Sequence, residues 1–278
     1  MAGVNARADE VSYFALDGDL LDSGDGGNDG AVVGGAALTF VEGYDGAEGG
    51  ALHFNAADQT LVSLAQTTGL PLNTQPVFSI AMWVRGPVGQ RDLRIFSEGS
   101  TTNNTPLFNL GTHNRGANGA LDGYIRGNGG ALLNHTYSTS VVFDDTWHHI
   151  AWSDNNGRVV LYVDGVADGT DFSYTRAPMD VNTTTIGGIL RATPSYHWRG
   201  EIDEVRLYNY ALSEEDVAGI LEPGGVVAEI CDNNRDDDLD GQVDCDDSDC
   251  ARHNACQVEI CGNGEDDDGD GAADCDDS

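Results

Sequence analysis

The sequence predicts an antiparallel β-sandwich followed by an acidic, disulfide-bonded tail. In residues 11–210, short runs rich in Val, Ile, Thr and aromatic residues alternate with clusters of Gly, Asn and Asp, a rhythm typical of strands separated by turns. All six cysteines and 19 of the 47 acidic residues lie after residue 225. That tail has almost no large apolar residues, so we expect disulfides and bound ions to hold it in place of an apolar core.

Four segments have the clearest strand pattern, and two turns connect them. The strands are Val77–Arg85, Trp147–Ser153, Arg158–Val163 and Gly200–Tyr208. Residues 154–157 (DNNG) predict a tight hairpin between the second and third strands, and Asp164-Gly165 predicts the next turn, because Gly tolerates a positive φ. We therefore expect three neighbouring strands to form a meander.

One short helix is predicted at the end of the sandwich. Ser213 is a suitable N-cap, residues 214–216 are acidic, and Val217, Ile220 and Leu221 form an apolar stripe. The sequence Pro-Gly-Gly at 223–225 then ends the domain. We divide the chain into an N-terminal arm (1–10), a sandwich domain (11–222), a linker (223–228) and a repeat region (229–278).

Charge and cysteine content limit the partners and the compartment. The formal net charge of −34 disfavours nucleic acid and anionic membrane surfaces as partners. No apolar stretch is long enough to span a bilayer, and residues 1–10 lack the pattern of an export signal, which we expect to have been removed or left out. The regularly spaced cysteines favour an oxidising compartment, so we expect a secreted or cell-surface protein.

The tail contains two repeats with the pattern of a calcium loop. Residues 229–248 align without gaps with residues 259–278, and each contains the string D-x-D-x-D-G-x-x-D-x-x-D. Calcium takes about six to eight oxygen ligands, which alternate residues of a tightly curled loop can direct at one centre, and Gly permits the sharp turn. The predicted ligands are Asp236, Asp238, Asp240, Gln242 (through its carbonyl), Asp244 and Asp247, and in the second repeat Asp266, Asp268, Asp270, Ala272 (through its carbonyl), Asp274 and Asp277.

The cysteines are spaced for disulfides and not as the paired ligands that zinc prefers. Six cysteines allow many pairings. We favour the set in which the first two disulfides each clamp the ends of one calcium loop; it joins Cys231 to Cys245, Cys261 to Cys275, and Cys250 to Cys256. The alternative to this whole interpretation is a disordered acidic tail that keeps the domain soluble.

These repeats resemble the calcium-binding repeats of the thrombospondin type 3 kind and the Cys-, Asp- and Asn-rich arrays of large bacterial surface proteins. The resemblance covers residues 229–278, and its Asp-Gly string occurs twice. The sequence stops at Ser278, before a counterpart of Cys250, so the resemblance implies that the second repeat is truncated.

The sandwich resembles the laminin G-like, concanavalin A-like jelly roll over residues 8–222. The segments that carry the resemblance are 78–85 (FSIAMWVR), 147–152 (WHHIAW), 160–165 (VLYVDG) and, most specifically, 200–213 (GEIDEVRLYNYALS). The resemblance implies an all-β jelly roll and an extracellular module that binds glycans or proteins, or that only spaces other modules, usually without catalysis.

The laminarinase-type glucanases share this fold and place two catalytic carboxylates on alternate residues of one strand. Residues 201–203 (EID) begin such a string, but Val205 and Arg206 stand where the second Glu is expected. Asp203 has the strand parity of Val205 and Leu207, so we predict that it points to the interior and is structural. We therefore predict no catalytic residue.

Two further sets of residues are candidates for binding in the sandwich. In jelly rolls of this kind a calcium often ties an N-terminal loop to the last strand, which makes Asp22 and Asp203 candidate calcium ligands; the alternative is that Asp22 caps a turn and Asp203 bonds backbone amides or an arginine. Tyr196, Trp198 and Arg199 are candidate ligand-binding residues, because aromatic faces stack on sugars and Arg offers a planar set of donors. Simple packing is their alternative role.

We predict a non-catalytic binding or adhesion module, with a glycan or extracellular protein as ligand, on a calcium-stabilised stalk. A first alternative is a structural subunit that associates with itself in a calcium-bound fibre or surface layer. A second is a glycoside hydrolase, which needs two carboxylates about 5–9.5 Å apart. Neither nucleic acid binding nor membrane insertion is expected.

Overall fold

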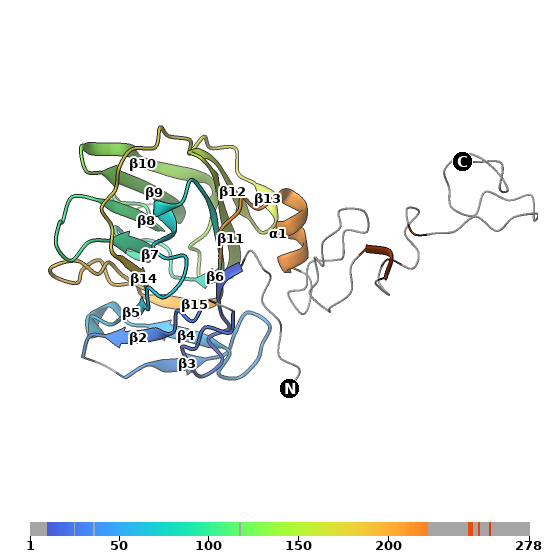
Figure 1. The fold of residues 1–278 in the computed structure, drawn as a ribbon. Coiled ribbons are helices and arrows are strands. Elements are labelled where there is room, and N and C mark those ends of the chain that lie inside the picture. The colour runs from blue at the N-terminus through green and yellow to red at the C-terminus, as the bar shows by residue number, and fades with distance from the viewer. Residues whose placement is uncertain are drawn as a thin grey trace, which may run out of the picture. The chain divides into compact units, whose positions relative to one another are not determined.

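The computed structural model describes residues 10–24, 26–35, 37–116 and 118–221, and in the tail residues 244–246, 250 and 256. Ala8–Val217 forms one compact unit. Ala8–Val217 contains the strands of two antiparallel sheets, drawn in Figure 1. The predicted fold class, an all-β antiparallel sandwich with one short helix, is confirmed.

The strands pair in the order β13-β12-β11-β6-β15-β4-β3 in sheet A, with β1 also paired to β15, and in the order β10-β9-β8-β7-β14-β5-β2 in sheet B. Sheet A comprises β1 (Glu10–Phe14), β3 (Thr39–Val41), β4 (Ala51–Phe54), β6 (Val77–Arg85), β11 (Trp147–Asn155), β12 (Arg158–Val163), β13 (Val166–Ala167) and β15 (Gly200–Tyr208). Sheet B comprises β2 (Gly30–Val33), β5 (Leu61–Leu64), β7 (Arg94–Gly99), β8 (Leu107–Thr112), β9 (Ala120–Gly127), β10 (Gly130–Val141) and β14 (Thr183–Ile186). The helical elements are η1 (Ala56–Asp58), η2 (Leu72–Thr74), α1 (Glu214–Leu221) and η3 (Asp244–Asp246).

An apolar core lies between the two sheets. Strand β6 shows the alternation that produces it, since Phe78, Ile80, Met82 and Val84 all belong to the core. Phe108 of sheet B meets Phe78 and Trp152 of sheet A edge to face, with ring centroids 5.7 and 5.8 Å apart. Such aromatic pairs each add about 0.5–1.5 kcal/mol beyond the burial of their area, so these contacts join the sheets directly.

The locally encoded elements agree with the prediction. Strands β6, β12 and β15 have the predicted bounds, and β11 extends two residues further, to Asn155. At the first turn Asn156 and Gly157 have φ values of 54° and 86°, and at the second Asp164 and Gly165 have 51° and 80°. Because β11, β12 and β13 are neighbours in sheet A, the predicted meander is confirmed.

Helix α1 begins as its N-terminal sequence predicts. The Ser213 hydroxyl accepts a hydrogen bond from Asp216 N (3.1 Å), and the Asp216 carboxylate accepts one from Ser213 N (2.7 Å). This reciprocal pair satisfies two of the backbone donors that a helix N-terminus leaves free. The predicted N-cap at Ser213 is therefore confirmed.

The last strand departs from the prediction at Asp203. The register between β15 and β6 shifts after Asp203, and Glu204 adopts a φ of 49°. Asp203 lies opposite Trp83 on the outer face of sheet A, whereas Ile202 and Val205 belong to the core. The prediction that Asp203 points to the interior is wrong, because the parity argument assumes a regular strand and a β-bulge interrupts this one.

Asp203 is nevertheless only 2% exposed. The segment after β3 covers it: Tyr44 N donates to Asp203 Oδ2 (3.1 Å), and the Tyr44 ring stacks on Trp83 with centroids 4.3 Å apart. Asp203 is therefore buried by this covering loop and not by the interior of the sandwich.

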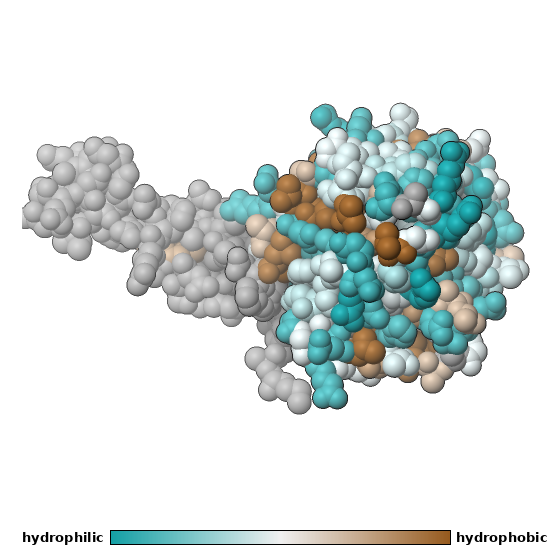
Figure 2. Space-filling model, turned by 180° about the vertical axis from the view of Figure 1, so that it is seen from behind, coloured by the Kyte–Doolittle hydropathy of each residue, from teal (hydrophilic) through white to brown (hydrophobic). Residues whose placement is uncertain are grey.

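Figure 2 shows separate apolar patches divided by hydrophilic residues on the face turned away from the view of Figure 1. Large apolar side chains that are exposed in the described residues include Val160 and Val166 on β12 and β13. Over that same part of the chain, no helix is long and apolar enough to cross a membrane.

Candidate functional site

A pocket of about 170 Å³ lies on the outer face of sheet B. Strands β7 to β10 form one side of it, and the segment between β14 and β15 forms the other. The lining residues are Asp92, Arg94, Leu107, Asn109, Tyr124, Arg126, His135, Ile189, Arg191 and Tyr196.

Strand alternation explains why polar side chains gather on this face. On β9, Leu121 and Ile125 belong to the core, so Tyr124 and Arg126 lie on the opposite face. On β8, Phe108 and Leu110 are core residues in the same way, which places Asn109 on the outer face. The two strands pair with Asn109 directly opposite Tyr124, so the floor of the pocket combines an amide with an aromatic ring.

The opposite wall is held by backbone hydrogen bonds. Tyr196 O accepts from Arg94 N (3.0 Å), and Ile189 and Ser195 exchange two N–H···O bonds of 2.9 and 3.1 Å. The guanidinium groups of Arg94 and Arg191 lie over the Tyr196 ring, 5.7 and 5.4 Å from its centroid. These contacts fix Tyr196 at the rim, where it stays 39% exposed.

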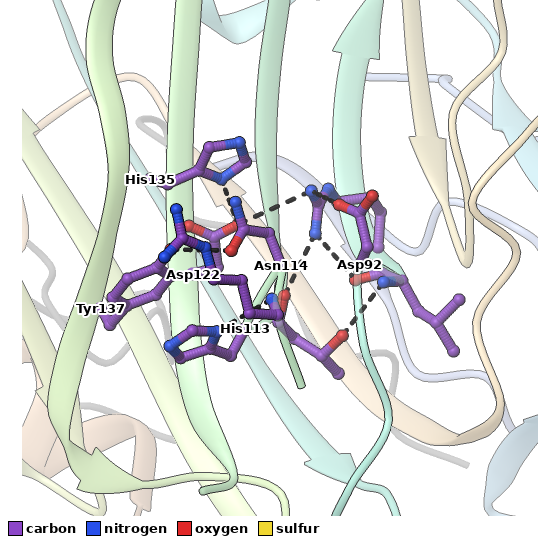
Figure 3. A network of polar contacts seen from close by, with 10 residues as sticks. Asp92, His113, Asn114, Asp122, His135 and Tyr137 are labelled. Carbon is purple, nitrogen blue, oxygen red and sulfur yellow. Dashed lines mark hydrogen bonds and ion pairs between the residues drawn. The ribbon is translucent and has the colours of Figure 1, made fainter. Parts of the chain in front are cut away.

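A network of charged and aromatic side chains adjoins the pocket (Figure 3). The buried Asp122 carboxylate lies 2.9 Å from His135 Nδ1 and 3.6 Å from an Arg94 terminal nitrogen, which also lies 2.5 Å from Asp92 Oδ1. Burial raises the pKa of Asp122, while the charge of Arg94 and its contact with His135 oppose that rise. The 2.9 Å contact with Asp122 fixes the orientation of His135. The His135 ring stacks on Tyr124, with ring centroids 4.4 Å apart.

Three buried polar atoms on this face have no hydrogen-bond partner among the described residues. They are Arg94 Nε, Asn109 Oδ1 and Asp122 Oδ1, on side chains that are at most 3% exposed. A buried polar atom without a partner costs about 1–3 kcal/mol. Arg94 and Asn109 both line the pocket, but these particular atoms are covered by neighbouring groups and do not face it.

The structure separates the three predicted ligand-binding residues. Tyr196 lines the pocket, whereas Arg199 is exposed outside its lining, and its carbonyl accepts from Gln90 Nε2 (2.8 Å). Trp198 is completely buried in the core, where it packs on Phe143 with centroids 5.2 Å apart. The prediction that Trp198 stacks on a ligand is therefore wrong, because its ring fills space inside the sandwich.

Sequence reasoning missed most of this pocket. Asp92, Arg94, Asn109, Tyr124 and Arg126 come from three strands and a preceding loop, and no short motif contains them. The available signal was the run 120–127 (ALDGYIRG), whose outward positions carry a carboxylate, an aromatic ring and a guanidinium.

Asp22 and Asp203 make separate contacts. The Asp22 carboxylate accepts from the backbone N–H groups of Tyr13 (2.9 Å), Gly24 (3.0 Å) and Asn28 (2.8 Å), as its turn-capping alternative predicts.

Burial raises the pKa of Asp203 to about 7, and the charges of Glu204 and Asp17 contribute. Asp17 is thus the N-terminal carboxylate that influences Asp203. Among the described residues, no group of three His, Cys, Asp or Glu side chains is placed to hold a metal ion.

Most of the predicted tail site lies outside the described residues. Asp244 begins the short helix η3. The other predicted ligands lie outside the described residues, namely Asp236, Asp238, Asp240, Gln242, Asp247, Asp266, Asp268, Asp270, Ala272, Asp274 and Asp277, as do Cys231, Cys261 and Cys275.

The described cysteines pair differently from the favoured set. Cys245 is bonded to Cys256, with Cα atoms 4.9 Å apart, and Cys250 is also disulfide-bonded. The predicted pairs Cys231–Cys245 and Cys250–Cys256 are therefore wrong. The prediction assumed that a disulfide clamps each calcium loop, whereas this one joins the end of the first repeat to the segment that precedes the second.

Comparisons with known proteins agree with this architecture. The family model Laminin_G_3, described as the concanavalin A-like lectin/glucanases superfamily, matches residues 55–218. No curated protein matches the chain significantly.

Solved structures with the same fold include domain 4 of AbnA, a GH43 extracellular arabinanase from Geobacillus stearothermophilus, in complex with arabinotriose. It has 20% identity and a TM-score of 0.60, over 78% of this chain and 100% of that domain. The binding domain of Paraclostridial Mosquitocidal Protein 1 has 14% identity and a TM-score of 0.55, over 75% of this chain and 51% of the other. Botulinum neurotoxin type C, whose cell entry is described as dependent on two ganglioside molecules, has 13% identity and a TM-score of 0.54, over 75% of this chain and 50% of the other. These likenesses concern the fold, and the chain spans about half the length of the two toxin chains.

Proposed function

Because the chain belongs to the concanavalin A-like lectin/glucanases superfamily, we propose that its sandwich is a non-catalytic binding module and that the pocket on sheet B binds a saccharide. One observation carries the proposal: the pocket combines partly exposed aromatic rings with the guanidinium groups of Arg126 and Arg191, which keep N–H donors without a described hydrogen-bond partner. A saccharide has the matching chemistry, since its ring offers C–H faces and its edges carry hydroxyl groups.

Each part of the pocket has a role in this proposal. Tyr196, at the rim, and Tyr124, on the floor, offer aromatic faces against which a sugar ring can stack. Arg126 and Arg191, which are only partly buried, can donate hydrogen bonds to oxygen atoms of the sugar. Mostly preformed pockets with a few oriented polar groups are typical small-ligand sites.

Two of the similar structures support a saccharide ligand. The solved complex of AbnA domain 4 contains arabinotriose, and that domain is matched over its whole length. One of the toxin relatives is described with gangliosides, which are glycolipids, and this also supports a saccharide as the recognised group. An extracellular location follows from the same proposal, because such ligands lie outside the cell.

The carboxylates beside the pocket favour binding over hydrolysis. A glycosidase needs one carboxylic acid and one carboxylate directed at the scissile bond. Asp92 and Asp122 are instead both directed at the Arg94 guanidinium, and Asp122 also contacts His135. Their described contacts give them the role of fixing Arg94 and His135 in the wall of a binding site.

We further propose that calcium stabilises the protein, in the tail repeats and beside Asp203. In the sandwich the residues fit a hard cation: a Cβ built on Gly43 would lie 2.7 Å from Asp203 Oδ2 and 3.0 Å from Gly50 O, so oxygens converge where only glycine leaves room. Asp17 adds a second carboxylate near Gly50. Bound calcium would supply the positive charge that a buried, high-pKa carboxylate needs in order to ionise.

The test of the proposed function is a glycan array followed by calorimetry with the best saccharide. Tyr196→Ala and Tyr124→Ala should each weaken binding about fivefold, since stacking on an aromatic ring is worth about 1 kcal/mol. Tyr210→Ala is the matched control, because this tyrosine packs on Tyr208 of sheet A. If the array yields no saccharide, or if all three variants bind like the parent, the pocket is not a saccharide site.

A further inference from the structure

The pocket is rich in cations although the domain is acidic. Residues 1–225 contain 28 acidic residues and 11 arginines. Three of those arginines, Arg94, Arg126 and Arg191, line this one pocket, and Asp92 is the acidic residue that lines it with them. This concentration of arginines makes the electrostatic potential at the pocket more positive than over the rest of the acidic domain.

The three guanidinium groups differ in how far their charge is balanced. Arg94 lies between the carboxylates of Asp92 and Asp122. Arg126 and Arg191, in contrast, have no carboxylate within 4.0 Å among the described residues of the sandwich. The positive charge of the pocket therefore resides mainly on Arg126 and Arg191.

Neutral groups hold both of these arginines in place. Arg126 donates through Nε to Thr105 O and through Nη2 to Asn104 O (2.6 Å). Arg191 donates through Nε to Ser195 Oγ (3.2 Å), and its guanidinium lies over the Tyr196 ring. These contacts orient the side chains without neutralising them. Arg191 keeps both terminal nitrogens, and Arg126 keeps Nη1, without a described hydrogen-bond partner.

We propose that the pocket selects an acidic saccharide, with Arg126 and Arg191 binding the anionic group of the sugar. This inference rests on the proposed saccharide-binding function. A guanidinium group binds carboxylate or sulfate oxygens through charge-assisted hydrogen bonds, which are about twice as strong as neutral ones. Tyr124 and Tyr196 hold the sugar ring beside these arginines.

The inference is tested with a matched set of oligosaccharides. The three oligosaccharides share the same neutral chain and differ only in the terminal sugar, which is glucuronic acid, glucose or glucose 6-sulfate. The Kd of each is measured by calorimetry. The glucuronate or sulfate form should bind about tenfold or more tightly than the glucose form, and comparing the two acidic forms shows which anion fits. R126Q and R191Q should reduce this preference severalfold. R158Q, which removes an equal charge outside the pocket, should keep it.

Two failures can be told apart. If neutral saccharides bind as well as acidic ones, in this set and on the array, and Tyr196→Ala still weakens them, the selectivity is refuted and saccharide binding stands. If neither the set nor the array yields a ligand, the proposed function itself is refuted. A preference that survives both R126Q and R191Q in folded protein also overturns the inference.

Discussion

A carboxyl group inside the sandwich should make its stability depend on pH in a predictable direction. Glu98 on β7 is fully buried. Its carboxylate accepts from Leu72 N (2.5 Å), Asn73 N (2.8 Å) and the Thr184 hydroxyl (3.1 Å). Burial raises the pKa of Glu98 from 4.5 to about 7, although these donors and the charge of Arg176 favour the ionised form.

The size and sign of the effect follow from that difference. Between about pH 4.5 and 7 the folded protein keeps the Glu98 proton and the unfolded chain releases it, so the free energy of unfolding falls as pH rises. One pKa unit corresponds to about 1.4 kcal/mol, so the whole window contributes about 3 kcal/mol. Below pH 4.5 this contribution is fully present, and above about pH 7 it is lost.

The assay compares parent and Glu98→Gln in urea unfolding from pH 4 to 8. Gln cannot titrate, and its amide group meets the Leu72 or Asn73 N–H, which adds a destabilisation of about 1–3 kcal/mol that does not vary with pH. The stability of the variant relative to the parent should therefore rise by about 3 kcal/mol as pH increases. If the difference in unfolding free energy between the variant and the parent stays constant across this pH range, Glu98 does not hold its proton in the folded protein as described.

Three further outcomes are expected. His149, whose burial lowers its pKa to about 4, should have the opposite effect to Glu98, so His149→Phe should remove a gain in stability of about 3 kcal/mol between pH 4 and 6.5 in the same urea assay. Trp198→Ala should cost about 3–5 kcal/mol in urea unfolding and leave the Kd for the saccharide unchanged; Gly86→Ala, whose Cβ would lie 2.5 Å from the Trp198 ring, should also destabilise, whereas Gly129→Ala meets no atom within 4 Å and should not. Calcium should raise the melting temperature of the full chain and Asp203→Asn should diminish that rise; an identical calcium response in this variant would leave the sandwich without a calcium site.

The elements that sequence analysis predicted well are those whose information is local. Strand β6 could be predicted because its apolar residues alternate within nine positions. The turn at Asn156 and Gly157 requires positive φ values, and these residue types tolerate them. The start of α1 depends on Ser213 and Asp216, three positions apart. In each case the interacting groups lie within a few residues of one another.

The errors occur where a distant segment decides the outcome. Asp203 lies on the outer face of sheet A because of the bulge at Glu204, and the segment containing Tyr44, about 160 positions away, covers it. Tyr196 and Trp198 have the same parity in a short aromatic run, yet one reaches the pocket and the other the core. A disulfide is also non-local, and Cys245 joins Cys256 across a segment whose calcium pattern suggested another partner.

The sequence by itself therefore determined the sandwich class, the strands with regular alternation, their tight turns and the capped helix, because hydrophobic periodicity and turn chemistry act between near neighbours. Tertiary structure alone decided which polar residues meet on the outer face of sheet B. Arg94, Asn109, Tyr124 and Tyr196 become one site only when strand pairing and the β14–β15 segment bring them together. The pairing of strands depends on segments that are far apart in the sequence, so no local sequence pattern predicts it.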